Sequence, residues 1–136
     1  MRNAYSPWAE LAALPHLELR RERPASGTLG QYMHHKSMIL LHPDMPRRQA
    51  RSVLCHELRH AEAGDTGFSL RQEFLADTRA ARLLVDHRDL ADAMVLHDQH
   101  RSAVAVELGV SLDVVQTRLK HLWRREWQYL RRRLAD

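Results

Sequence analysis

The sequence contains one cysteine, Cys55, and few aromatic residues, and each shortage restricts the kind of protein that it specifies. A single cysteine cannot form an internal disulfide, which favours a reducing compartment. The simplest role for Cys55 is that of a small buried apolar residue rather than a catalytic thiol. Aromatic residues make up 6% of the chain, so we expect a core built mainly from aliphatic side chains.

Long apolar runs are also missing. No stretch is apolar for long enough to cross a membrane, and the first residues lack the apolar centre of a signal peptide. We therefore expect a cytoplasmic protein with no membrane partner. The 136 residues, of which 44% are hydrophobic and 28% charged, are typical of one globular domain. The net charge of +4 permits an acidic partner without requiring one.

The most informative stretch that is present is H-E-x-x-H, formed by His56, Glu57 and His60. Residues four apart lie on the same face of a helix, so the two imidazoles can bind one metal ion. Glu57 lies beside them and can reach a water molecule bound to that metal, which is the arrangement of a zinc peptidase. Because such a short pattern also arises by chance, it needs a supporting helix, a third ligand and a place for substrate.

The surrounding residues predict the supporting helix. Asp44 is the expected N-cap, and Pro46 suits the first turn. Val53 and the two histidines lie on one side of this helix. A separate apolar stripe would pack on the core, and it consists of Ala50, Leu54, Leu58 and Ala61.

A second helix is predicted to begin at Ser69, which forms a capping box with Gln72. Glu73 and Asp77 share a stripe with alanine and leucine, so they face inward and need a partner. Glu73 is therefore the candidate third metal ligand. Asp77, one turn later, can hold the free nitrogen of a ligand histidine. The alternative is that both acids lie on the surface of an amphipathic helix.

The first 41 residues predict a short helix and a small sheet. Residues 7–14 form the helix, residues 16–21 alternate as a half-buried strand does, and residues 31–41 form two strands joined by a tight turn. We expect an α+β fold whose sheet is mainly antiparallel, with residues 38–41 as an exposed edge that an extended substrate can join. His34 and His35 are better explained as turn residues than as metal ligands.

Residues 87–136 are predicted to be helical. Residues 87–96 would bury Leu90, Met94 and Val95, and His97 and His100 follow. Either histidine is a candidate for stabilising an oxyanion or contacting substrate, and the alternative is an exposed histidine at a helix end. Further on, Ala105, Gly109 and Val115 fit the frame of a helix-turn-helix, with Ser111 capping its second helix.

The last predicted helix is strongly basic. It is a candidate DNA contact, because arginines bind phosphates and guanine. The preferred interpretation is that these helices close the peptidase core or dock the substrate, with Trp123 and Trp127 in packing or partner contacts. The basic residues concerned are Arg118, Lys120, Arg124, Arg125, Arg131, Arg132 and Arg133.

Taken together, residues 30–85 resemble an ImmA/IrrE-type metallopeptidase domain, a small gluzincin-like fold. The resemblance depends on the strand at 39–41, the H-E-x-x-H helix, and the block Glu73-x-x-Ala76-Asp77-x-x-Ala80-Ala81-x-Leu83-Leu84. The segment at 108–122 is similar to the C-terminal part of that family. The resemblance implies His56 and His60 as zinc ligands, Glu57 as catalytic base and Glu73 as third ligand.

Two positions depart from the family pattern. Arg59 stands where glycine is frequent, and Asp86 lies near a position where proline is common. Arg59 is bulky and charged, so it would narrow the cleft or contact substrate. We expect a single metallopeptidase domain over residues 1–136, with a catalytic core at 1–86 and a C-terminal helical part at 87–136.

The motif and its candidate third ligand predict a zinc-dependent endopeptidase, and the resemblance implies that it carries out intracellular, limited proteolysis. The resemblance implies a protein substrate such as a repressor or another regulatory protein of a phage or mobile element. The alternative is a DNA-binding transcriptional regulator whose zinc site is structural or sensory. A third interpretation is a toxin–antitoxin component that acts through protein contacts alone.

Overall fold

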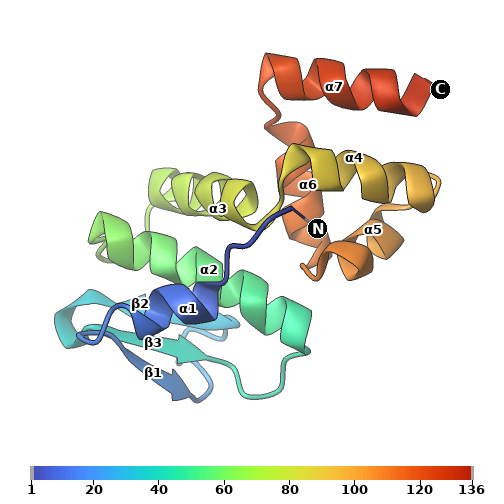
Figure 1. Ribbon diagram of the computed structural model, residues 1–136. Coiled ribbons are helices and arrows are strands. Elements are labelled where there is room, and N and C mark those ends of the chain that lie inside the picture. The colour runs from blue at the N-terminus through green and yellow to red at the C-terminus, as the bar shows by residue number, and fades with distance from the viewer. Residues whose placement is uncertain (1, 136) are drawn as a thin grey trace.

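The computed structural model describes residues 2–135, which form an α+β fold with one small sheet and a larger set of helices (Figure 1). The predicted fold class is therefore confirmed. In chain order the elements are α1 (Pro7–Ala12), β1 (Glu18–Arg21), β2 (Gly30–Met33), the 3-10 turn η1 (His34–Lys36), β3 (Met38–Leu41), α2 (Arg47–Ala63), α3 (Leu70–Leu84), α4 (His87–Leu96), α5 (Arg101–Leu108), α6 (Leu112–Lys120) and α7 (Arg124–Ala135). Among residues 2–135, no helix combines the length and apolarity that crossing a membrane requires.

The sheet differs from the prediction in two respects. Its strand order is β1-β3-β2, and β3 pairs in parallel with β1 and antiparallel with β2. It is therefore mixed rather than mainly antiparallel. β3 is the central strand and all four of its residues are buried, so the prediction that it forms an exposed edge was wrong. The physical reason is its uninterrupted apolar run, which is typical of a strand covered on both faces.

The H-E-x-x-H helix, α2, lies over the sheet and in the middle of the molecule (Figure 1). Its N-cap is Pro46 rather than Asp44, because the carbonyl of Pro46 accepts the first helical hydrogen bond, from the amide of Ala50 at 3.0 Å. The predicted apolar stripe reaches the sheet: Leu54 and Leu58 are buried against the strands, in a cluster with Leu17, Ile39 and Leu41.

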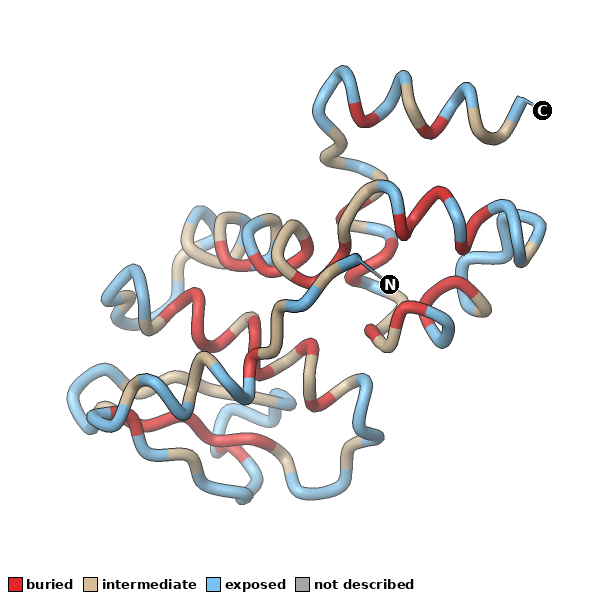
Figure 2. Tube along the Cα trace, viewed as in Figure 1, coloured by how far each residue is buried: buried red, intermediate tan, exposed pale blue. Residues whose placement is uncertain are grey.

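A second apolar cluster lies on the other side of α2 and extends through α3 to α7. Cys55 joins this cluster and is fully buried, as expected for a small apolar residue. Because Ala80 and Leu84 of α3 belong to the same cluster as the C-terminal helices, the apolar core is continuous across residue 86. In Figure 2, buried positions lie along α2, between the sheet and the C-terminal helices.

The C-terminal helices include the predicted helix-turn-helix frame. α5 ends at Gly109, which has a positive φ of 67°, and α6 follows after Ser111. The basic segment is divided into two helices by residues 121–123 rather than forming one. α6 packs on α3, whereas α7 packs on α4. Val95 is 48% exposed, so its predicted burial beside Leu90 and Met94 was wrong.

Candidate metal centre

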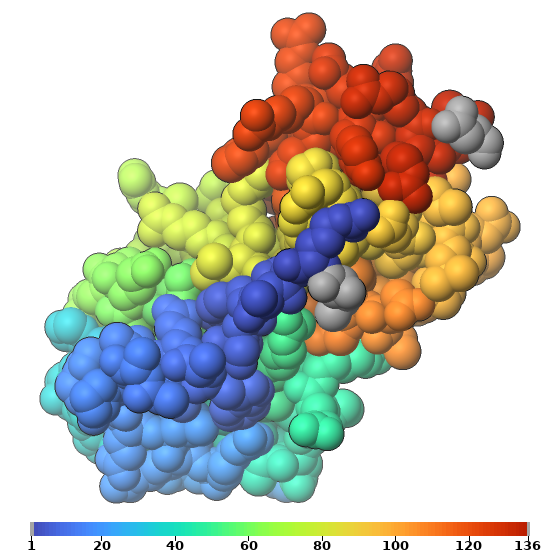
Figure 3. Space-filling model, viewed as in Figure 1, coloured from blue at the N-terminus to red at the C-terminus, as the bar shows by residue number. Residues whose placement is uncertain are grey.

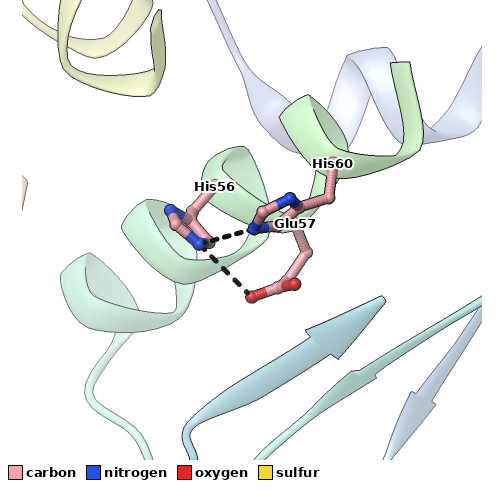
Figure 4. Close-up of side chains that lie close together, drawn as sticks. All are labelled: His56, Glu57 and His60. Carbon is pink, nitrogen blue, oxygen red and sulfur yellow. Dashed lines mark hydrogen bonds and ion pairs between the residues drawn. The ribbon is translucent and has the colours of Figure 1, made fainter. Parts of the chain in front are cut away.

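The two histidines of the motif point at each other from successive turns of α2 (Figure 4). The Nε2 atoms of His56 and His60 lie 3.1 Å apart. Both imidazoles thus lie on one face of α2, where His60 is buried and His56 is half-buried. This is the one-face arrangement that a spacing of four residues produces on a helix.

Glu73, near the start of α3, brings its carboxylate to both of these nitrogens. Its Oε2 lies 3.0 Å from Nε2 of His56, and its Oε1 lies 3.1 Å from Nε2 of His60. The cap of α3 fixes this position, because the Ser69 hydroxyl accepts a hydrogen bond from the amide of Gln72. Two imidazole nitrogens and one carboxylate thus converge on a single point, as metal ligands do.

An aspartate holds the outer nitrogen of each histidine. Nδ1 of His56 lies 2.8 Å from Asp77 Oδ1, and Nδ1 of His60 lies 2.8 Å from Asp65 Oδ2. A carboxylate at Nδ1 keeps a proton there, so Nε2 is the nitrogen that can bind a metal ion, which would displace any proton that Nε2 carries. Both imidazoles are therefore oriented for metal binding by the chain itself.

Asp65 reaches His60 through the way in which α2 ends. Gly64 has a positive φ of 67°, its amide donates to the carbonyl of Ala61, and the amide of Asp65 donates to the carbonyl of His60. This pair of bonds is a Schellman motif, which folds the chain back over the last turn of a helix. The aspartate side chain is thereby returned to the imidazole that lies five residues earlier.

Glu57 lies beside the convergent point without being part of it. Its Oε2 is 3.9 Å from Nε2 of His56, and the residue is buried. Figure 4 shows its carboxylate between α2 and the nearest strand. Burial raises the pKa of Glu57, while the charges of the two histidines and a backbone hydrogen bond from Tyr32 lower it in part. A buried carboxylate with a raised pKa is suited to accept and return a proton.

The charge around His56 is strongly negative. Burial lowers the pKa of His56, but the hydrogen bond to Asp77 and the charges of Glu57, Asp77 and Glu73 outweigh it and raise the pKa to about 9. Carboxylates that stabilise an imidazolium at this point stabilise any cation placed there. The site is therefore electrostatically prepared for a metal ion.

An open cleft of about 700 Å³ runs past these residues. α2 forms its floor with Gln49, Val53, His56 and His60, which lie three or four residues apart on one helix face. β2 and the preceding loop form one wall. α3 and α6 form the other wall, with Asp77 and Ala80 from α3, Asp113 and Thr117 from α6, and Ser111 at the N-cap of α6.

The predicted second helix of the helix-turn-helix is therefore part of the cleft. α6 buries Val114, Val115 and Arg118 and packs on α3, and its first residues line the cleft wall. A recognition helix needs a free outer face to enter a DNA groove. This arrangement agrees with the preferred interpretation, in which the C-terminal helices close the peptidase core.

Arg59 points away from the cleft. It is 5% exposed, its guanidinium pairs with Glu10 of α1, and its Nε donates to the carbonyl of Cys55 at 3.3 Å. The hydroxyl of Tyr5 also donates to Glu10. Arg59 thus joins α2 to the N-terminal segment, and it is not one of the residues that line the cleft. The expectation that it narrows the cleft was wrong, because position 59 lies on the opposite side of α2.

His97 and His100 lie in the connection between α4 and α5. Nε2 of His97 is 3.1 Å from Glu107 Oε1, and Nδ1 of His100 is 3.1 Å from the carbonyl of His97. Neither residue lines the cleft. His100 is exposed and His97 is half-buried, so their positions agree with the alternative interpretation of histidines at a helix end.

Three features of the site lie outside the sequence interpretation. They are the contact of Asp65 with His60, the contact of Gly30 with Glu57, and the α6 wall of the cleft. An acid two residues after the H-E-x-x-H helix is a weak signal for Asp65. No signal in the sequence places Gly30 beside Glu57, because that contact joins segments far apart along the chain.

In this chain an H-E-x-x-H helix lies over a sheet, and a glutamate from the next helix reaches the two histidines. This arrangement defines the class of small metallopeptidase domains. The chain belongs to the peptidase M78 family, described as the IrrE N-terminal-like domain, which it matches over residues 19–120. The predicted resemblance is thereby confirmed, and the family supports a metallopeptidase function. Comparisons with curated proteins and with solved structures gave no match.

Proposed function

We propose that the protein is a zinc-dependent endopeptidase that cuts a protein substrate at a limited number of bonds. The observation that carries this proposal is the convergence of His56 Nε2, His60 Nε2 and the Glu73 carboxylate at mutual separations of 3.0–3.1 Å. The ligand set of two histidines and one glutamate is that of catalytic zinc sites with an open fourth position.

The residues fit zinc in spacing as well as in chemistry. Ligand atoms 2.0–2.1 Å from a tetrahedral ion lie about 3.4 Å apart. The two imidazole nitrogens and the carboxylate oxygens are slightly closer than this, so a small outward rotation of the side chains admits the ion. Bound zinc would polarise the scissile carbonyl and acidify a water molecule. Glu57 would accept the proton of that water and deliver it to the leaving amine.

We propose that the substrate lies extended along β2 rather than along β3. β2 is an edge strand of the sheet, and Leu29, Gly30, Gln31 and Tyr32 form a wall of the cleft. An extended peptide can add to such an edge through backbone hydrogen bonds. From His60 to Gln49 the α2 floor is about 16 Å long, which accommodates about five extended residues.

Other features bear on where the protein acts and on which protein it cuts. The single cysteine supports action in the reducing cytoplasm. Backbone pairing along β2 distinguishes few side chains of the substrate, so the target must be selected mainly by contacts outside the cleft. A repressor, or another regulatory protein of a phage or mobile element, is the substrate that the family resemblance implies. A repressor-like gene beside the gene for this protein would support that assignment.

The proposal is tested by separating metal binding from cleavage. Glu57→Gln should retain one zinc per chain and lose cleavage of a quenched fluorescent peptide library, because the proton acceptor is removed. Glu73→Ala should lose zinc, because a ligand is removed. Asp98→Asn, an exposed acid distant from the cleft, is the control and should leave both unchanged. Full zinc occupancy in Glu73→Ala would exclude Glu73 as a ligand, and cleavage by Glu57→Gln would exclude the proposed base.

The alternative of a DNA-binding regulator with a structural or sensory zinc site makes a different prediction. It requires sequence-selective DNA binding that persists in Glu57→Gln. The position of α6 in the cleft wall speaks against a helix-turn-helix that reads a DNA groove.

A further inference from the structure

α7 is the element that the metallopeptidase function leaves unused. It follows the family match, which ends at residue 120. It packs on α4 through buried Glu126 and Leu130 and forms one end of the molecule (Figures 1 and 3). Its remaining surface faces away from the cleft-forming helices. A role for this surface must therefore be sought in a partner outside the peptidase site.

The inward-facing arginines of this region already have acidic partners. The Arg118 guanidinium is buried and pairs with both oxygens of Glu126, which also accepts from Arg82. Arg133 pairs with Asp92 of α4 at 2.7 Å. Among the described residues, Glu126 and Asp92 are thus both occupied by arginines, which come from α3, α6 and α7.

The outward-facing arginines have no such partners among residues 2–135. Arg124, Arg125, Arg131 and Arg132 are exposed, and within residues 2–135 none of them has a carboxylate within 4.0 Å. Residues seven apart on a helix lie on one side, about 10 Å from each other. The four arginines therefore form two parallel columns, 124 with 131 and 125 with 132, and no exposed acid of α7 lies between them within the described part of the chain.

Trp127 stands in the first of these columns. It lies three residues after Arg124 and four before Arg131, and it is 50% exposed. Trp123 is exposed too, but the Arg82 guanidinium lies 3.6 Å from its ring centroid and covers one face. Among the described residues, no aromatic ring or cation stacks on Trp127. α7 thus presents one open indole face between two unpaired cations.

The chemistry of this face is complementary to a polyanion that also carries flat rings. Arginine and tryptophan are also frequent at protein–protein interfaces, but the centre of such an interface is mostly apolar, whereas this face carries four arginines around a single indole. Proteins that bind single strands combine a basic track for phosphates with aromatic side chains on which unpaired bases stack. A base inside a duplex offers no ring face to an indole. We propose that the outward face of α7 binds single-stranded nucleic acid, with the arginine columns on phosphates and Trp127 on a base.

The test uses the full chain and a fluorescein-labelled 20-nucleotide oligo-dT, followed by anisotropy across a salt series. Arg124→Gln/Arg131→Gln should weaken binding at least tenfold at low salt and reduce the slope of log affinity against log salt by about 1.4, since each single-strand phosphate contact contributes about 0.7. Arg71→Gln/Arg79→Gln removes the same charge from exposed arginines of α3 and should change neither quantity. Trp127→Ala should weaken binding about tenfold, and Trp127→Phe should retain most of the affinity.

Four results would overturn the proposal. One is no binding of oligo-dT at 50 mM salt, and another is an equal loss of affinity in the α3 and α7 double variants. Duplex binding as tight as single-strand binding, unaffected by Trp127→Ala, would exclude base stacking. Equally tight competition by poly-glutamate of the same charge would instead identify an acidic protein as the partner. The binding experiment measures neither zinc content nor peptide cleavage, so its outcomes are independent of the proposed peptidase function.

Discussion

Gly30 of β2 lies against Glu57 of α2 so closely that a side chain at position 30 would press on Glu57 and collide with the neighbouring Val53. A Cβ at position 30 would be 3.1 Å from both Cγ and Oε2 of Glu57, and 2.5 Å from Cγ1 of Val53. The absence of a side chain at residue 30 therefore sets the distance between the edge strand and the candidate catalytic base. One contact therefore positions both β2, which we propose binds the substrate, and Glu57, which we propose transfers the proton.

Gly30→Ala should consequently impair both stability and cleavage. The strand or Val53 must move by several tenths of an ångström, and such overpacking costs typically about 1–3 kcal/mol. We expect the free energy of unfolding to fall by about 2 kcal/mol, and peptide cleavage to fall at least tenfold with zinc content unchanged. Urea unfolding and cleavage assays measure these effects. Adding Val53→Ala should restore part of the stability, and no effect of Gly30→Ala would contradict the close approach.

Asp65→Asn should weaken metal binding without unfolding the protein. The amide oxygen of the new side chain would still accept a hydrogen bond from Nδ1 of His60, but the negative charge 2.8 Å from that nitrogen would be lost. Removing an outer partner of a ligand histidine usually lowers metal affinity about 10–100-fold. Competition with a chelating dye measures the zinc affinity, and Asp98→Asn is the matched loss of one exposed charge. Equal affinities for the two variants would show that Asp65 does not support His60.

Arg59→Met should destabilise the fold while leaving substrate affinity intact. It removes the buried partner of Glu10 and the donor to the Cys55 carbonyl. Breaking a buried ion pair from one side costs about 3 kcal/mol or more. The double variant Glu10→Gln/Arg59→Met should regain part of this loss, since no lone charge is left. A raised KM at unchanged stability would place Arg59 in contact with substrate instead.

Glu126 makes stability depend on pH in the acid range. Burial raises its pKa, but hydrogen bonds from Arg118, the Trp123 amide and Arg82 outweigh this and hold the pKa at about 2. Because the folded pKa lies below the usual value of about 4.5, ionised Glu126 contributes stability above about pH 4.5. That contribution is lost as the pH falls toward 2.

Glu126→Gln should therefore lower the free energy of unfolding near pH 7 by about 3 kcal/mol and by progressively less on acidification. Denaturant unfolding at pH 7, 5, 4 and 3 measures the difference between the two proteins. Glu107→Gln, at an exposed carboxylate paired with His97, is the control and should change stability little at any pH. A difference that stays constant from pH 7 to pH 3 would contradict the lowered pKa.

The sequence by itself determined the features that depend on residues close together in the chain. The spacing of His56 and His60, the cap at Ser69, and the placement of Glu73 and Asp77 one turn apart are periodic or local, and the structure has the same arrangement. The helix-turn-helix frame around Gly109 is local as well. Its use as part of the cleft wall is not.

Only the tertiary structure decided which surfaces meet. Strand order, the side of α2 on which Arg59 lies, the return of Asp65 to His60, and the approach of Gly30 to Glu57 depend on packing between distant segments. It also decided which arginines of the basic segment are paired inside the protein and which remain free on α7. The type and spacing of residues specify which face of a helix or strand each one occupies. Which other element packs against that face depends on how the whole chain buries its apolar surface.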